Sequence, residues 1–141
     1  MIQPTIDAFF QRYADAYCQY QTDRLLDMFA LPCMLLTDNS KHIIVDQDTG
    51  RGLLERLFKA YQQLQMEHLQ HEITSMVKLS DSLYFVSVQG RFFLNDNRLL
   101  LQCHTSYTLQ NKGTEWKIVA VVMDDEEEEL QRLGVVLEPV L

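Results

Sequence analysis

The sequence predicts a mixed α+β domain in which helices come first and an antiparallel sheet follows. Apolar residues recur at helical spacing through most of the first half, whereas from about residue 72 they alternate with polar residues. Three short polar turns, at 80–82, 95–97 and 111–113, divide this second part into four long strands. Strands joined by such short turns pair as antiparallel neighbours.

Two helices are expected before the first strand. The apolar face of the first helix consists of Ile6, Phe9, Phe10, Tyr13, Ala14 and Tyr17. Pro4 stands just before this face, in the first turn, where proline is tolerated. Thr22 fits the N-cap of a short second helix that contains Leu25 and Leu26 and that Pro32 ends.

The next segments predict two short strands, a third helix and the four-strand meander. The short strands cover 33–37 and 42–45, on either side of a turn at 38–40. Asp48 or Thr49 caps the third helix, which ends near Gln65 or Met66. The long strands are expected at 72–79, 83–94, 99–110 and 115–123. A strongly curved sheet of this kind can wrap around the helices and leave a pocket at its open end.

Composition excludes several classes of function. The 141 residues suffice for one domain with a core. The net charge is −8, but residues 1–123 carry only −2, because six consecutive acids follow from Asp124 to Glu129. Without a basic face we expect no nucleic-acid partner, and without a long apolar run no membrane partner. Cys18, Cys33 and Cys103 are odd in number and lack metal-site spacing, which fits reduced thiols in a cytoplasmic protein.

The order of elements and the segment "QRYADAY...DRLLDMFALP" resemble the nuclear-transport-factor-2-like superfamily, specifically its SnoaL-like branch. The resemblance covers about residues 5–125 and implies a cone-shaped fold with three N-terminal helices in the curved sheet. The final "EWKIVAVVMDD" is similar to the last strand of that fold, where Trp116 and Ile118 would face inward. We therefore assign 1–125 to a SnoaL-like α+β domain and 126–141 to a C-terminal extension, acidic and then apolar.

One enzyme of the superfamily, ketosteroid isomerase, is similar at individual positions and implies catalytic roles. Its Gln-Arg-Tyr segment aligns with residues 11–13 and makes Tyr13 an oxyanion-hole donor. Its catalytic base falls at Thr37 or Asp38, and Asp38 is the residue that can act as a base. Its second donor, a protonated aspartate, falls on Thr105, whose hydroxyl is a weaker donor. Asp38 has an alternative role in an Asx turn.

Further residues are expected at the pocket. Ligand-binding candidates are Tyr17, Tyr61, Thr105, Tyr107 and Trp116, since tyrosine combines an apolar ring with a polar hydroxyl. The alternative for the tyrosines is that they only fill the core. His68 and His71 have a spacing that can ligate a metal on a helix, but no third ligand is evident and the segment is expected to be a helix-to-strand junction. We therefore predict no metal.

The leading hypothesis is a pocket for a small apolar or carbonyl-containing molecule. Any enzymatic activity would be proton transfer without a cofactor, of the isomerase or dehydratase type, with Tyr13 polarising a carbonyl and Asp38 moving the proton. The alternative is a non-catalytic dimeric interaction or assembly domain. We expect a homodimer through the outer face of the sheet, where polar residues such as His104 alternate with the inner set and Val119 and Val121 add apolar area.

The C-terminal extension predicts a short helix. Leu130 and Leu133 share one face, Arg132 suits the C-terminal end, and Gly134 is a natural stop. The apolar residues 135–141 are expected to dock against the sheet or a partner subunit.

Overall fold

The computed structural model describes residues 2–38 and 40–134, and it has the predicted order of elements. Helices α1 (Gln3–Cys18) and α2 (Thr22–Leu26) precede the strands β1 (Phe29–Leu36) and β2 (Lys41–Ile44). Helix α3 (Gln47–Gln63) leads into four long strands, namely β3 (Met66–Ser80), β4 (Leu83–Leu94), β5 (Leu99–Lys112) and β6 (Glu115–Met123). Helix α4 (Glu126–Arg132) follows, as expected, and residues 135–141 lie outside the described part.

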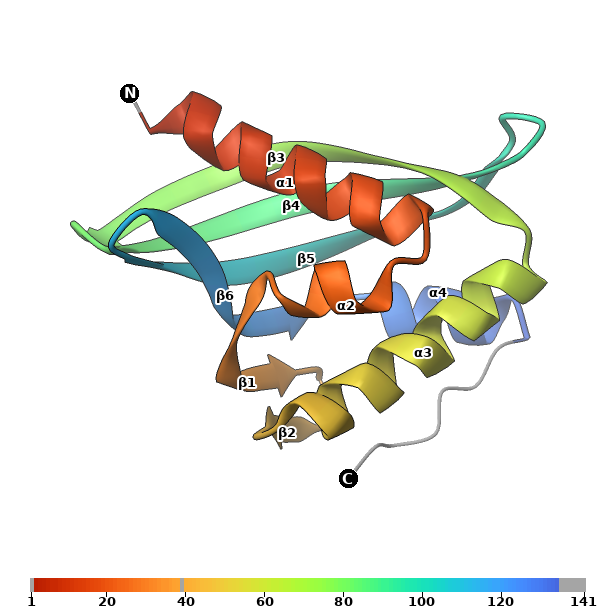
Figure 1. Ribbon diagram of the computed structural model, residues 1–141. Coiled ribbons are helices and arrows are strands. Elements are labelled where there is room, and N and C mark those ends of the chain that lie inside the picture. The colour runs from red at the N-terminus through yellow and green to blue at the C-terminus, as the bar shows by residue number, and fades with distance from the viewer. Residues whose placement is uncertain (1, 39, 135–141) are drawn as a thin grey trace.

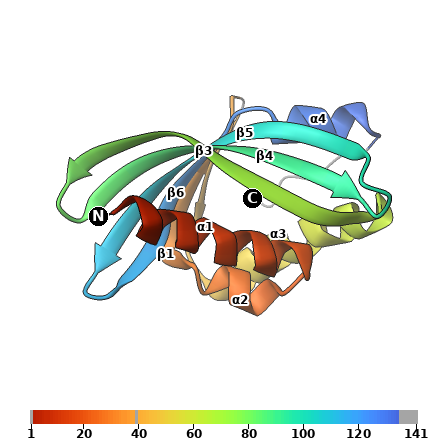
Figure 2. The ribbon, with the colours of Figure 1, turned by 90° about the horizontal axis from the view of Figure 1, so that it is seen from above.

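The six strands form one sheet in the order β2-β1-β6-β5-β4-β3. The sheet is strongly curved, and α1, α2 and α3 lie on its concave side (Figure 1). Figure 2 shows α4 beside β5, away from α1. The predicted α+β class and cone-like arrangement are thus confirmed. One pair departs from the expected antiparallel sheet, because β1 runs parallel to β6.

The core lies between α1 and the inner face of the sheet. Helix α1 buries Phe9, Phe10, Tyr13 and Tyr17, which recur at three- and four-residue spacing on one face. Strand β5 presents alternate residues to them, with Tyr107 at ring-centroid distances of 5.1 Å from Phe10 and 5.6 Å from Tyr13. This packing fixes the direction in which the tyrosine hydroxyls point.

Several predicted boundaries shift for local reasons. Helix α2 ends at Leu26, so Pro32 lies inside β1. Asp46 caps α3 by accepting a hydrogen bond from the Thr49 backbone N at 2.8 Å, which places the expected cap residues inside the helix. Gln65 has a φ of 63°, and this left-handed residue turns the chain directly into β3. His68 and His71 consequently lie in a strand, not at a junction.

A β-bulge near the middle of β6 changes which side chains face inward. Leu109 pairs with Ile118 and Thr108 with Ala120, which leaves Val119 as an extra residue. One extra residue moves every later side chain to the other face. Val121 is therefore buried, and the expectation that it lies on the outer face is wrong.

Among the described residues, no helix is both long enough and apolar enough to cross a membrane.

Candidate functional site

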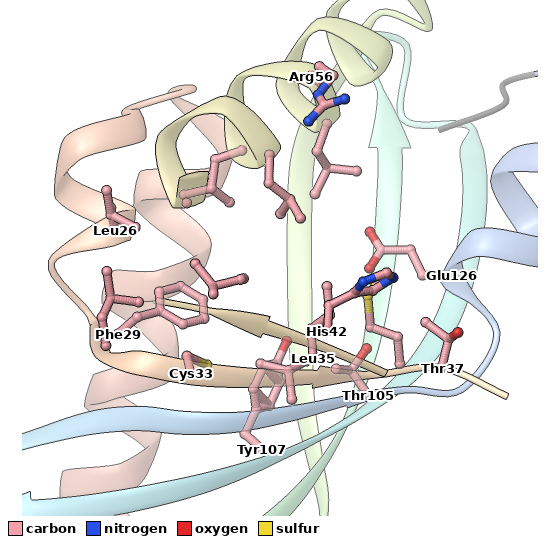
Figure 3. Close-up of a pocket in the computed structure, with 18 of the residues that line it drawn as sticks. Leu26, Phe29, Cys33, Leu35, Thr37, His42, Arg56, Thr105, Tyr107 and Glu126 are labelled. Carbon is pink, nitrogen blue, oxygen red and sulfur yellow. The ribbon is translucent and has the colours of Figure 1, made fainter. Parts of the chain in front are cut away.

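A cavity of about 360 Å³ lies between α3, the β1–β2 pair and the inner faces of β5 and β6 (Figure 3). Its wall is mostly apolar, with Leu31, Cys33 and Leu35 from β1 and Leu53, Leu54 and Leu57 from α3. Gly50 allows α3 to approach α2 at this wall, since a Cβ there would lie 2.8 Å from Leu26 Cδ1. The volume lies in the range of pockets that hold small molecules.

One buried carboxyl group faces this cavity. Glu126, the first residue of α4, is only 7% exposed. Its Oε2 accepts hydrogen bonds from the Tyr61 hydroxyl at 2.5 Å and from the Tyr17 hydroxyl at 3.3 Å. Burial raises the pKa of Glu126 above its ordinary value, and the two hydroxyls offset part of that rise. A carboxyl group in this setting is a candidate acid or base.

A second pair of tyrosines lines the same region. The Tyr107 hydroxyl donates to the Tyr13 hydroxyl at 3.4 Å, and the Thr105 hydroxyl group lies on the same inner face. Burial raises the pKa of Tyr13, so the phenol keeps its proton and can donate it in a hydrogen bond. The pair therefore offers a donor to a carbonyl oxygen in the cavity.

A small inner chamber of about 20 Å³ adjoins the main cavity. It shares Tyr13, Tyr107 and Glu126 with that cavity and adds His71 from β3. The His71 Nδ1 atom is buried and has no hydrogen-bond partner among the described residues, and burial lowers the pKa of His71 to about 4. A space of this size with polar neighbours can hold one water molecule.

Polar side chains also gather where the cavity meets solvent. Arg56 is the exposed member of the described lining, and Thr37, Ser40 and His42 are half-buried. The hydroxyl oxygens of Thr37 and Ser40 lie 2.6 Å apart across the β1–β2 turn. His42 and Ile44 alternate with exposed residues along β2, so both point into the cavity.

The described residues contain no group of three or more histidine, cysteine, aspartate or glutamate side chains arranged to hold a metal ion.

Comparison with known proteins gives the family. A family model described as NTF2-like protein (DUF6841) matches residues 3–126. The chain belongs to this NTF2-like family. No curated protein matches the chain.

Solved structures share the NTF2-like fold at low sequence identity. An NTF-2-like protein of unknown function from Shewanella oneidensis is 13% identical, with a TM-score of 0.70 over 89% of this chain and 100% of that one. A ketosteroid isomerase-like protein from Erwinia carotovora atroseptica is 11% identical, with a TM-score of 0.59 over 88% and 95%. A putative calcium/calmodulin-dependent protein kinase type II association domain from Thiobacillus denitrificans is 10% identical, with a TM-score of 0.68 over 84% and 92%.

Four of the expected site residues of this NTF2-like domain line the cavity, namely Tyr13, Tyr17, Thr105 and Tyr107. Tyr61 lies behind the wall, where it bonds to Glu126. Asp38 is exposed and does not line the cavity; its neighbour Thr37, the first residue after β1, lines it instead.

Trp116 lies elsewhere in the domain. It packs against Tyr84 with ring centroids 5.4 Å apart, and it does not line the cavity. A strand advances about 3.3 Å per residue, so Trp116 is roughly 16 Å along β6 from Val121 at the cavity wall. The expectation that Trp116 contributes to the pocket is therefore not met.

The polar cavity residues that the sequence did not indicate are Glu126, His71, His42, Arg56 and Ser40. The sequence offers one usable signal for Glu126, its position at the start of a helix directly after an inward-facing strand. His71 carries no comparable signal, because its strand was expected to begin only at Glu72.

Proposed function

We propose that this NTF2-like domain binds a small, largely apolar molecule in the cavity and holds a carbonyl or hydroxyl oxygen of it beside Tyr13 and Glu126. The supporting observation is the one-sided polarity of the cavity. Figure 3 shows Leu26 and Phe29 at one end, and Thr37 and Glu126 at the other. Pockets of this composition orient an apolar ligand through a few polar groups. No cofactor enters this proposal.

Binding of 2-naphthol, a small aromatic ring system with one hydroxyl group, tests the proposal. We expect saturable binding, followed by the fluorescence of the probe. Leu35→Trp places a large ring in the cavity and should abolish binding, whereas Val77→Trp on the exposed surface of β3 should not. Far-ultraviolet circular dichroism of both variants verifies that they fold. Equal binding by the two variants would contradict the proposal.

A second candidate function is proton transfer at the carbon next to a carbonyl group. Glu126 favours it, since a carboxylate with a raised pKa is a stronger base than an ordinary one. The ionised Glu126 would take a proton from the α-carbon while Tyr13 donates a hydrogen bond to the carbonyl oxygen. Glu126 takes the role first expected of Asp38, which is exposed to solvent.

Hydrogen–deuterium exchange of 2-tetralone tests this activity without knowledge of the substrate. In D₂O, reprotonation of the enol returns deuterium to the α-carbon, and NMR follows the loss of the proton signal. We expect exchange faster than the buffer rate, lost in Glu126→Gln and kept in Glu128→Gln, which removes an exposed carboxyl from the same helix. Exchange that persists in Glu126→Gln would exclude Glu126 as the base.

We also propose a homodimer through the outer face of the sheet. Met34 and Ile43 are cross-strand partners on this face of the β1–β2 pair, and they are 37% and 52% exposed. Further along, Ser87 and Ser106 bond to each other, and Arg91 bonds to Gln102. A surface that mixes apolar and polar groups in this way is typical of an interface.

The cysteines favour a reducing compartment. Cys18, Cys33 and Cys103 are all free thiols, and Cys33 and Cys103 are buried. We propose a cytoplasmic location, in which such thiols stay reduced.

A further inference from the structure

Two arginines on α3 have different surroundings. The Arg51 guanidinium contacts Asp23 at 3.0 Å and Asp48 at 3.5 Å. Arg56 lines the cavity, and its Nε atom donates a hydrogen bond to the Gly52 carbonyl oxygen at 3.4 Å. Arg56 has no ion pair with any side chain that the structure describes. The positive charge of Arg56 can therefore interact with an anionic group of a molecule in the cavity.

The position of Arg56 on α3 directs its side chain toward the cavity. Leu53 and Leu57 flank it at three residues before and one residue after, and both line the cavity. Figure 3 shows the Arg56 side chain on the α3 side of the cavity, with His42 and Thr37 on the strand side. A ligand that enters between helix and strands would thus have a guanidinium on one side and an imidazole and a hydroxyl on the other.

A positively charged side chain at the cavity contrasts with the negative charge of the protein as a whole. The net charge is −8, so the average surface repels anions. A guanidinium presents a planar fork of donors that matches a carboxylate. A guanidinium with no ion pair among the described side chains, at the solvent end of an apolar cavity, would therefore favour an anionic group on the molecule inside.

We infer that the ligand is a hydrophobic carboxylate whose anionic group lies between Arg56 and His42 and whose apolar body contacts the leucines of α3 and β1. The inference rests on the proposed function, because it names the class of molecule for the same cavity. The carboxyl group of Glu126 is buried, and its Oε2 atom already accepts hydrogen bonds from the Tyr61 and Tyr17 hydroxyls, so its interactions are directed toward these tyrosines.

A matched pair of probes tests the charge preference. 2-Naphthoate and 2-naphthamide have nearly the same shape but differ in charge at neutral pH. We expect calorimetry to give roughly tenfold tighter binding of 2-naphthoate, which corresponds to one charge-assisted hydrogen-bonded contact. Arg56→Gln should remove the preference without weakening 2-naphthamide, and Arg56→Lys should keep part of it. Arg51→Gln, which removes the same charge from the same helix outside the cavity, should leave the preference intact.

Two outcomes would overturn the inference while the proposed function stands. One is that the two probes bind the unmodified protein equally well and that Leu35→Trp abolishes the binding of both. The other is a preference for 2-naphthoate that survives in Arg56→Gln. If neither probe binds the unmodified protein, the inference and the proposed function both fail.

Discussion

Tyr61 donates a 2.5 Å hydrogen bond to Glu126, a residue 65 positions later in the chain. This contact joins α3 to the start of α4 and places a carboxyl group at the inner wall of the cavity. Tyr17 of α1 bonds to the same oxygen, so three helices meet at one carboxylate oxygen. The chemistry of the candidate site therefore depends on the protonation of Glu126.

The pH dependence of stability should reveal this protonation. Because the folded pKa of Glu126 is raised above 4.5, its ordinary value, the folded state keeps the proton to higher pH than the unfolded state. The corresponding stability is present below pH 4.5 and is lost as the pH rises through the folded pKa. Urea unfolding at a series of pH values measures this effect. We expect the free energy of unfolding of Glu126→Gln not to show this decrease as the pH rises. Glu128→Gln, an exposed control, should follow the unmodified protein, and an identical profile for both variants would contradict a buried carboxyl.

The tyrosine hydroxyls should differ in their contribution to stability. Tyr61→Phe removes a donor to a buried carboxyl and should lower the free energy of unfolding by roughly 1–3 kcal/mol. Tyr13→Phe removes only a long hydroxyl–hydroxyl contact of 3.4 Å and should cost at most about 1 kcal/mol. Denaturant unfolding of the two variants measures both values. A larger cost for Tyr13→Phe would give Tyr13 a structural role instead of a ligand-binding one.

Local patterns predicted the elements and the inward-facing tyrosines, because helical and strand periodicities depend on neighbouring residues alone. Tyr13, Tyr17 and Tyr107 follow directly from those periodicities. Glu126 does not, since it stands in a run of six acids and only the tertiary path of the chain after β6 turns one of them inward. Val121 shows the same limit, because a single extra residue in the pairing with β5 reverses its face.

His71 should make the protein sensitive to mild acid. Its pKa is lowered by burial to about 4, whereas an ordinary histidine titrates near 6.5. As the pH falls below 6.5, His71 becomes protonated in the unfolded state but stays neutral in the folded state. The free energy of unfolding therefore decreases until the pH reaches about 4. The loss amounts to up to about 3 kcal/mol. His71→Leu should flatten this part of the profile in thermal unfolding, and His68→Gln, at an exposed histidine of the same strand, should not.

The proposed dimer predicts a response to charge on the outer face. Ile43→Glu introduces a carboxylate into the exposed Met34–Ile43 pair and should convert dimer to monomer in light scattering at micromolar concentration. Gln62→Glu adds the same charge at an exposed position of α3, on the concave side of the sheet, and is the control. A clean monomer before any substitution would exclude the dimer altogether.

The apolar side chains of α4 should contribute to stability as core residues do, although its acidic sequence predicted an extension. Leu130 is fully buried, and Leu133 packs against the same core. Leu130→Ala leaves a cavity and should lower the free energy of unfolding by about 2–5 kcal/mol. Leu99→Ala, at a position 51% exposed, should change it by no more than about 0.5 kcal/mol. Denaturant unfolding compares them directly. If Leu130→Ala is as mild as Leu99→Ala, then α4 is only loosely held, and Glu126 loses the support that keeps its carboxyl group against Tyr61.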